Sequence, residues 1–188
     1  MEQQMNLSAL NMVSEVELVY KNKVKSSERP IVKSSKDCYD LLSLTWDENK
    51  IEFVEQFKVI LLNRANRVLG IYELSTGGVT GTVADPKLVF TAALKANACN
   101  IILSHNHPSG NLKPSRTDEE LTKKIATAGM YLDIKLIDHI IVTSEGYYSF
   151  ADEGCCSPIL LLLCFFPIKA RLLPILLDNL IFNGKTNS

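Results

Sequence analysis

Segments with strand-like and helix-like patterns alternate along residues 51–154, and this order leaves few folds open to the chain. Apolar runs bounded by glycine, asparagine, aspartate or proline predict strands. These runs occupy residues 57–62, 68–74, 100–104, 132–143 and 147–150. A further short strand is expected from the Gly77-Gly78 turn to Thr82.

Two of the segments between the predicted strands contain residues that typically begin or end a helix. Residues 85–97 are expected to be a helix because Asp85 can cap it and Pro86 suits its first position. Residues 115–128 are expected to be a second helix, ended by Gly129. Because strands and helices are interleaved, the sequence predicts an α/β or α+β fold in which helices cover a sheet.

The chain outside this region differs in composition, so three zones are expected. Residues 1–50 are polar, contain one expected helix at Lys36–Trp46, and lack the glycine that a helix–hairpin–helix motif usually needs. Residues 155–188 are strongly apolar, but prolines and basic residues interrupt them, so no membrane span is expected. Two interpretations of this tail stay open: it packs on the domain or a partner, or it is not native to the domain.

Composition limits the class of protein. A net charge of −1 argues against strong non-specific binding to nucleic acid, although a local basic patch would not be excluded. The five cysteines include no C-x-x-C pair, so neither a disulfide framework nor a thiolate zinc site is indicated. The N-terminus has no basic segment followed by an apolar core, so a cytoplasmic protein is expected.

Two of the three histidines stand two residues apart, directly after an apolar run. In extended backbone, His105 and His107 point to one side and Asn106 to the other. The following Pro-Ser-Gly turn allows the first turn of the next helix to bring Asp118 towards the imidazoles. Two imidazole nitrogens and one carboxylate oxygen make a three-ligand zinc site with a fourth position open for water. An open position is typical of catalytic rather than structural zinc.

A structural interpretation competes for part of this motif. Ser115 and Asp118 also form an S-x-x-D capping box, which alone would assign Asp118 to the helix end. The conjunction with two histidines beside a tight turn favours the metal site, and Ser115 can cap the helix while presenting its hydroxyl. The pattern does not distinguish zinc from another divalent ion, because affinity order alone would favour copper.

The motif has a family context. The stretch HNHPSGNLKPSRTDEEL, together with LLNRANRVLG, STGGVTGTVADP and DHIIV, resembles the RadC-like branch of the JAB/MPN metalloprotease superfamily. Its H-x-H, seven residues and S-x-x-D match the JAMM motif, and the resemblance covers about residues 51–154. It implies a cytidine-deaminase-like sandwich with a central mixed β-sheet flanked by helices. It also implies a Zn²⁺ ion and hydrolysis of a peptide or isopeptide bond.

The resemblance further implies two catalytic residues. Glu55 matches the upstream glutamate that acts as general base, with Glu52 as the alternative; without the family, Glu55 would be a solvated residue before a strand. Ser115 would donate its hydroxyl to the developing oxyanion. His139, in the DHIIV stretch, is expected to be a hydrogen-bonded partner near the core and not a metal ligand.

Two other functions compete with a zinc hydrolase. One is a DNA repair or recombination accessory, the traditional association of RadC; the other is a zinc-binding scaffold without activity. Retention of Glu55 beside the ligand set favours chemistry, and the near-neutral charge argues against DNA. A cytidine deaminase is disfavoured because H-x-E and P-C-x-x-C are both missing. Six basic residues form either a patch near the site or ordinary solvated surface: Arg64, Arg67, Lys113, Arg116, Lys123 and Lys124.

Overall fold

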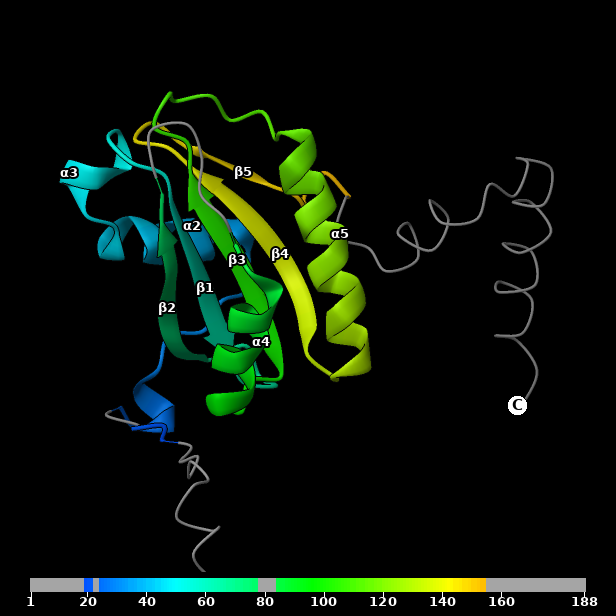
Figure 1. Cartoon of the computed structure of the whole chain (residues 1–188). Coiled ribbons are helices and arrows are strands. Elements are labelled where there is room, and N and C mark those ends of the chain that lie inside the picture. The colour runs from blue at the N-terminus through cyan, green and yellow to red at the C-terminus, as the bar shows by residue number, and fades with distance from the viewer. Residues whose placement is uncertain (1–18, 22–23, 78–83, 155–188) are drawn as a thin grey trace, which may run out of the picture.

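The computed structural model describes residues 19–21, 24–77 and 84–154 (Figure 1). The helices are η1 (Ser26–Glu28, a 3-10 turn), α2 (Ser35–Thr45), α3 (Glu48–Ile51), α4 (Pro86–Lys95) and α5 (Arg116–Tyr131). The strands are β1 (Gln56–Leu62), β2 (Val68–Thr76), β3 (Asn100–Asn106), β4 (Lys135–Val142) and β5 (Tyr147–Ser149). The strand expected at 77–82 and the apolar tail at 155–188 fall outside the described residues.

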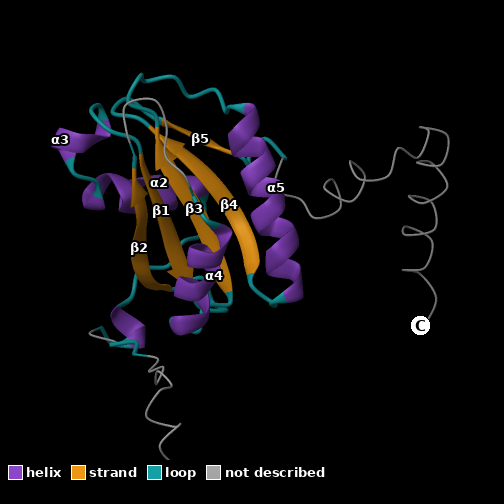
Figure 2. Ribbon diagram, in the orientation of Figure 1, coloured by secondary structure: helices purple, strands orange, loops and turns teal. Residues whose placement is uncertain are grey.

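The strands form one mixed sheet in the order β2-β1-β3-β4-β5. β3 and β4 are parallel, whereas every other neighbouring pair is antiparallel. The parallel pair is joined by α5, which crosses over the sheet, as such connections require (Figure 2). The expected α/β (α+β) class, with a central mixed sheet flanked by helices, is confirmed.

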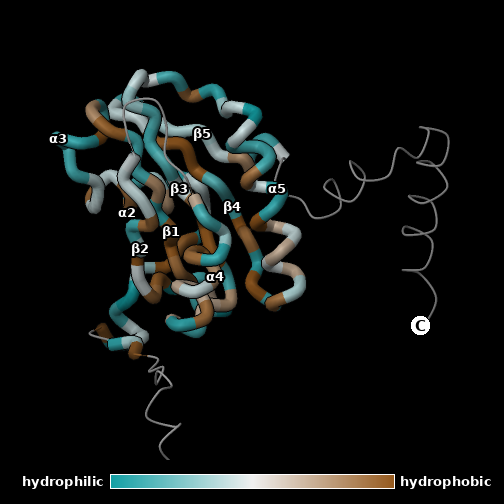
Figure 3. The backbone as a smooth tube through the Cα atoms, in the orientation of Figure 1, coloured by the Kyte–Doolittle hydropathy of each residue, from teal (hydrophilic) through white to brown (hydrophobic). Residues whose placement is uncertain are grey.

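Helices cover both faces of the sheet, so β1 is buried along its whole length and β3 is buried from Ile101 to Asn106. In β1, Val59 and Leu61 pack with α4 and α5, whereas Ile60 and Leu62 pack with α2. This alternation follows from the period of two in a strand, and the brown interior of Figure 3 shows its result. Among the described residues, no helix combines the length and apolar character needed to cross a membrane.

Helix α2 belongs to this layered core although it lies in the N-terminal zone. Its capping box is complete, because Ser34 accepts from the backbone N–H of Asp37 and the Asp37 side chain accepts from that of Ser34. Cys38 and Leu42 on this helix are fully buried against the sheet. The division of the chain at residue 50 stays a prediction, but part of the zone before it contributes to the core.

Helix α5 does not end at Gly129, as the sequence predicted, but continues to Tyr131. Gly129 has a packing role instead: a Cβ atom there would lie 2.2 Å from the carbonyl oxygen of Ile134. The chain reverses after the helix at Asp133, whose φ is 53°. Glycine is therefore required by the close approach of helix and strand, and not by a left-handed helix end.

Candidate metal centre

Strand β3 carries the first histidine within the sheet itself. The sequence predicted a strand that ended at Ser104, but β3 continues to Asn106 because both neighbouring strands still pair with it. His105 lies between Phe57 of β1 and Ile141 of β4. Its side chain is 1% exposed. The ring is thus held by paired backbone on both sides, which is a firmer support than a loop.

The side chains at the end of β3 alternate as predicted. His105 and His107 lie on the face covered by α5, where their ring centroids are 4.8 Å apart. Asn106 points to the other face and donates to the carbonyl oxygens of Ile51 (2.7 Å) and Val54 (2.9 Å). Its side-chain oxygen accepts from the backbone N–H of Gln56 at 2.7 Å. Asn106 therefore ties the segment that leads into β1 to the end of β3.

Asp118 caps helix α5 and also lies beside the two imidazoles, so the geometry is compatible with both interpretations that the sequence left open. The capping box is present, and Asp118 Oδ2 accepts from the backbone N–H and the hydroxyl of Ser115 at 2.7 and 2.6 Å. The same carboxylate faces the histidines: Oδ1 lies 3.4 Å from His105 Nε2, and Oδ2 lies 3.8 Å from His107 Nε2. Capping fixes the carboxylate at the start of α5, and this position brings it to the imidazoles.

The three side chains fit a metal ion. One ligand atom from each of His105, His107 and Asp118 lies within 4.8 Å of the others. His107 Nδ1 lies 2.6 Å from the carbonyl oxygen of Asn111, which can only accept, so Nδ1 carries the proton and Nε2 a lone pair. This lone pair faces His105 Nε2 at 2.9 Å. Two imidazole nitrogens and a carboxylate oxygen are a donor set that suits zinc.

Burial keeps the first histidine in the form that binds metal. It lowers the pKa of His105 to about 4, and the charge of Asp118 opposes this only in part. Burial also lowers the pKa of His139 well below its ordinary value, reinforced by the two other histidines. A neutral imidazole is the species that ligates zinc, so His105 needs no deprotonation near pH 7.

These pKa shifts predict that acid destabilises the metal-free protein. The folded pKa values lie below the unfolded value of about 6.5, so protons bind the unfolded chain preferentially as the pH falls from about 6.5 towards 4. Each of the two histidines should then remove up to ~1.4 kcal/mol of stability per pH unit. Urea unfolding of chelator-treated protein at pH 7, 6 and 5 measures this loss. His105→Gln should reduce the slope, and a flat profile in the unmodified chain would contradict the assignment.

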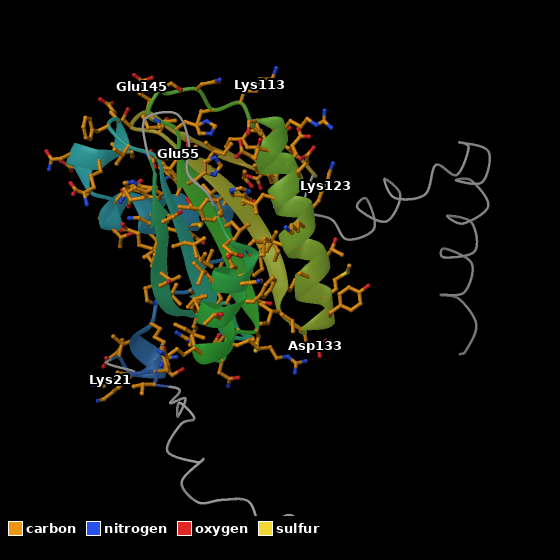
Figure 4. The ribbon with its side chains drawn as sticks, viewed as in Figure 1. Lys21, Glu55, Lys113, Lys123, Asp133 and Glu145 are labelled. Atoms are coloured by element: carbon orange, nitrogen blue, oxygen red, sulfur yellow. The ribbon has the colours of Figure 1, made fainter. Side chains whose placement is uncertain are left out.

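Glu55 directly precedes β1, whereas Glu52 lines a cavity on the α2 side of the sheet. The antiparallel register pairs Phe57 with His105, and Phe57 stacks on that ring at 5.8 Å between centroids. Extension of this register by two residues, beyond the paired segment, predicts that Glu55 lies opposite His107 and on the same face. Figure 4 shows Glu55 and Lys113 towards the same end of the sheet. Glu52 is exposed and lines a cavity beside Trp46 on the α2 side.

The Ser115 hydroxyl is engaged within the helix end. It donates to Asp118 Oδ2 at 2.6 Å and accepts from the backbone N–H of Asp118 at 3.2 Å. Its single hydrogen is therefore directed to the carboxylate, and what Ser115 visibly does is hold Asp118. Donation to an oxyanion, as the resemblance implies, would require this hydroxyl to turn and stays a prediction.

The six basic residues do not form one patch. Arg64 and Arg67 lie in or beside the β1–β2 turn, next to the start of β3 and so at the opposite end of the sheet from the histidines. Lys113 and Lys123 lie at the histidine end (Figure 4). Arg116 pairs with Glu120 one turn along α5, at 2.8 Å. Arg64, Lys113 and Lys124 are exposed, whereas Arg67 is half-buried and donates to the carbonyl oxygen of Arg29 at 3.1 Å.

Sequence reasoning missed two supports of the site. Thr122 contacts His139, which in turn contacts His105, and the Asn111 carbonyl oxygen contacts His107. Thr122 follows Asp118 by four residues and so shares its helix face, which is a signal that could have been used. The contact of His107 with the Asn111 carbonyl oxygen could not have been predicted from the sequence, because every residue has a backbone carbonyl.

Comparisons with known proteins identify the family to which the chain is similar. The family model described as RadC-like JAB domain matches residues 32–155. A UPF0758 protein of Flavobacterium johnsoniae is 46% identical over 123 residues, which cover 65% of this chain and 52% of that protein. A UPF0758 protein of Caldanaerobacter subterraneus is 40% identical over 119 residues, or 59% of this chain and 51% of that protein. A UPF0758 protein of Fusobacterium nucleatum is 34% identical over 152 residues, which cover 79% of this chain and 66% of that protein. The chain spans about half the length of the first two relatives.

Proposed function

Because the chain belongs to the RadC-like JAB domain family, we propose that it is a zinc-dependent hydrolase of peptide or isopeptide bonds. The observation that carries the proposal is the convergence of His105, His107 and Asp118. The extended register of β1 and β3 supports it, because this register predicts that Glu55 faces the same group. A site that only bound metal would need the three ligands but no carboxylate of this kind beside them.

The three ligands divide between rigid elements. His105 lies in the central strand, Asp118 in the first turn of α5, and His107 directly after β3, where its backbone N–H donates to the Val142 carbonyl oxygen at 3.1 Å. When bound, zinc supplies a Lewis acid that lowers the pKa of water to ~7 and polarises a carbonyl oxygen. The partly exposed His107 and Asp118 leave this centre accessible to substrate.

Glu55 is proposed to move the proton. A carboxylate beside the ligands takes a proton from the attacking water and returns it to the leaving amine, which a hydrolysis of an amide requires. Its location is maintained by Asn106, which binds both the Ile51 and Val54 carbonyl oxygens and the Gln56 N–H. The base and the ligands thus belong to one hydrogen-bonded framework.

Removal of metal tests the proposal. The full chain is incubated with a branched peptide, in which a lysine side chain carries an isopeptide bond to a second peptide's carboxyl end, and with a linear peptide. Cleavage of either should stop after treatment with EDTA and return with one equivalent of zinc. Zinc binding without cleavage of either peptide would leave a scaffold, and failure to bind zinc would overturn the proposal as a whole.

A further inference from the structure

A row of buried hydrogen bonds runs behind His105 and returns to helix α5. His105 Nδ1 lies 2.9 Å from His139 Nε2 on the neighbouring strand β4. His139 Nδ1 lies 2.7 Å from the Thr122 hydroxyl, which donates to the carbonyl oxygen of Asp118 at 2.6 Å. His105, His139 and Thr122 are each at most 1% exposed. The row therefore begins at one metal ligand, His105, and ends at another, Asp118.

The direction of every bond in this row is set by the last one. The Asp118 carbonyl oxygen can only accept, so the single hydroxyl hydrogen of Thr122 is directed to it. Thr122 must then accept from His139, so neutral His139 carries its proton on Nδ1 and a lone pair on Nε2. That lone pair accepts from His105 Nδ1–H, which leaves the lone pair of His105 on Nε2. Nε2 is the atom that faces Asp118 and His107.

We propose that Thr122 and His139 are positioning residues that fix the tautomer of His105, so that its free nitrogen points into the metal site. The proposal rests on the zinc site proposed above and extends it to two residues that contact no substrate. The outer partner of a metal-binding histidine is usually a carboxylate or a backbone carbonyl, which can only accept. Here the partner is the imidazole of His139, and either of its nitrogens could carry the proton unless Thr122 fixed it on Nδ1.

Packing prevents the row from rearranging by ring rotation. The His139 ring stacks on Phe150, with centroids 4.8 Å apart and planes 12° apart, and meets Phe57 at 5.7 Å. The backbone of His139 is paired with Leu103 in the sheet. With its ring so confined, His139 can respond to a lost partner by moving its proton between nitrogens, and this response is what the experiment detects.

Thr122→Val tests the proposal, because it keeps the shape of the side chain and removes the hydroxyl. The proton of His139 should then move to Nε2, the nitrogen that faces His105 Nδ1. A proton there disfavours the tautomer of His105 that carries its own proton on Nδ1 and binds metal through Nε2. We expect zinc affinity, measured by competition with a chelator, to fall ~10–100-fold, as for other outer partners of metal ligands. Nitrogen-15 NMR of the metal-free protein should show the His139 proton on Nδ1 in the unmodified chain and on Nε2 in the variant. Thr122→Ser should restore both.

Two controls separate this effect from helix stability and from the zinc proposal. Thr127→Val removes the same kind of bond on the same helix, from Thr127 to the Lys123 carbonyl oxygen at 2.8 Å, and should leave zinc affinity unchanged. In a His139→Gln background the amide oxygen can accept from His105 without Thr122, so Thr122→Val should lose its effect. Wild-type affinity and tautomer in Thr122→Val would overturn the inference. Absence of zinc binding in the unmodified chain would instead overturn the proposed function, while the NMR readout would still decide on the tautomer.

Discussion

Replacement of His107 by alanine should reduce bound zinc from one per chain to almost none, with little change in the fold. His107 has 16% of its side chain exposed and follows the strand, so its removal leaves the sheet intact. The loss of one of three ligands should weaken zinc binding by more than the ~10–100-fold typical of outer partners. Elemental analysis of the dialysed protein, beside a titration with a zinc-binding dye, measures both quantities.

The matched control for this change lies in the same loop. Lys113 is exposed and belongs to no ligand set, so Lys113→Ala should keep the zinc. The double change His105→Ala/His107→Ala should remove any metal that remains. Unaltered metal content in His107→Ala would mean that the ion is held elsewhere, and the site as described would be wrong.

Replacement of Glu55 by glutamine should abolish hydrolysis while zinc stays bound. Glutamine retains the size of the side chain but cannot accept a proton, and general-base catalysis contributes typically ~10²–10⁴-fold to rate. The affinity for zinc should change little, because Glu55 is not among the three ligands. Rates on the branched peptide, together with zinc stoichiometry of the same preparation, give the comparison.

Glu52 provides the control for this prediction. It is the alternative that the sequence left open, and it lies exposed at the end of α3. Glu52→Gln should therefore cleave at the unmodified rate. If activity instead survived in Glu55→Gln and disappeared in Glu52→Gln, the register argument for the base would fail, although the metal site would remain.

The features predicted well from the sequence are those that depend on neighbouring residues. The two-residue spacing of His105 and His107 predicts their common face, and the capping box predicts where α5 begins. Both depend on geometry that repeats within a few residues. The cap and the proposed ligand role of Asp118 do not exclude each other, because Oδ2 accepts from Ser115 while Oδ1 lies 3.4 Å from His105 Nε2.

The features that sequence reasoning missed depend on residues far away in the chain. β3 extends beyond Ser104 because Phe57 and Ile141 pair with His105, and neither partner is visible from residues 100–106. A glycine near a helix end ordinarily indicates the end itself. Gly129 instead lies within the helix, and it is a glycine because the carbonyl oxygen of Ile134 leaves no room for a side chain. Arg64 is distant from the site because β1 runs opposite to β3.

At the end of β3, the residues proposed for catalysis and the loop that could contact a substrate belong to different parts of the chain. The proposed ligands His105 and Asp118, and the segment that carries Glu55, are all held by the sheet or by the start of α5. The loop of residues 108–114 contributes to this framework chiefly through one backbone oxygen, that of Asn111, and a carbonyl is supplied by any amino acid. Apart from Gly110, whose φ is 74°, and Asn111, whose side chain accepts from the backbone N–H of Lys113, the side chains of this loop can diverge or be engineered towards a new substrate.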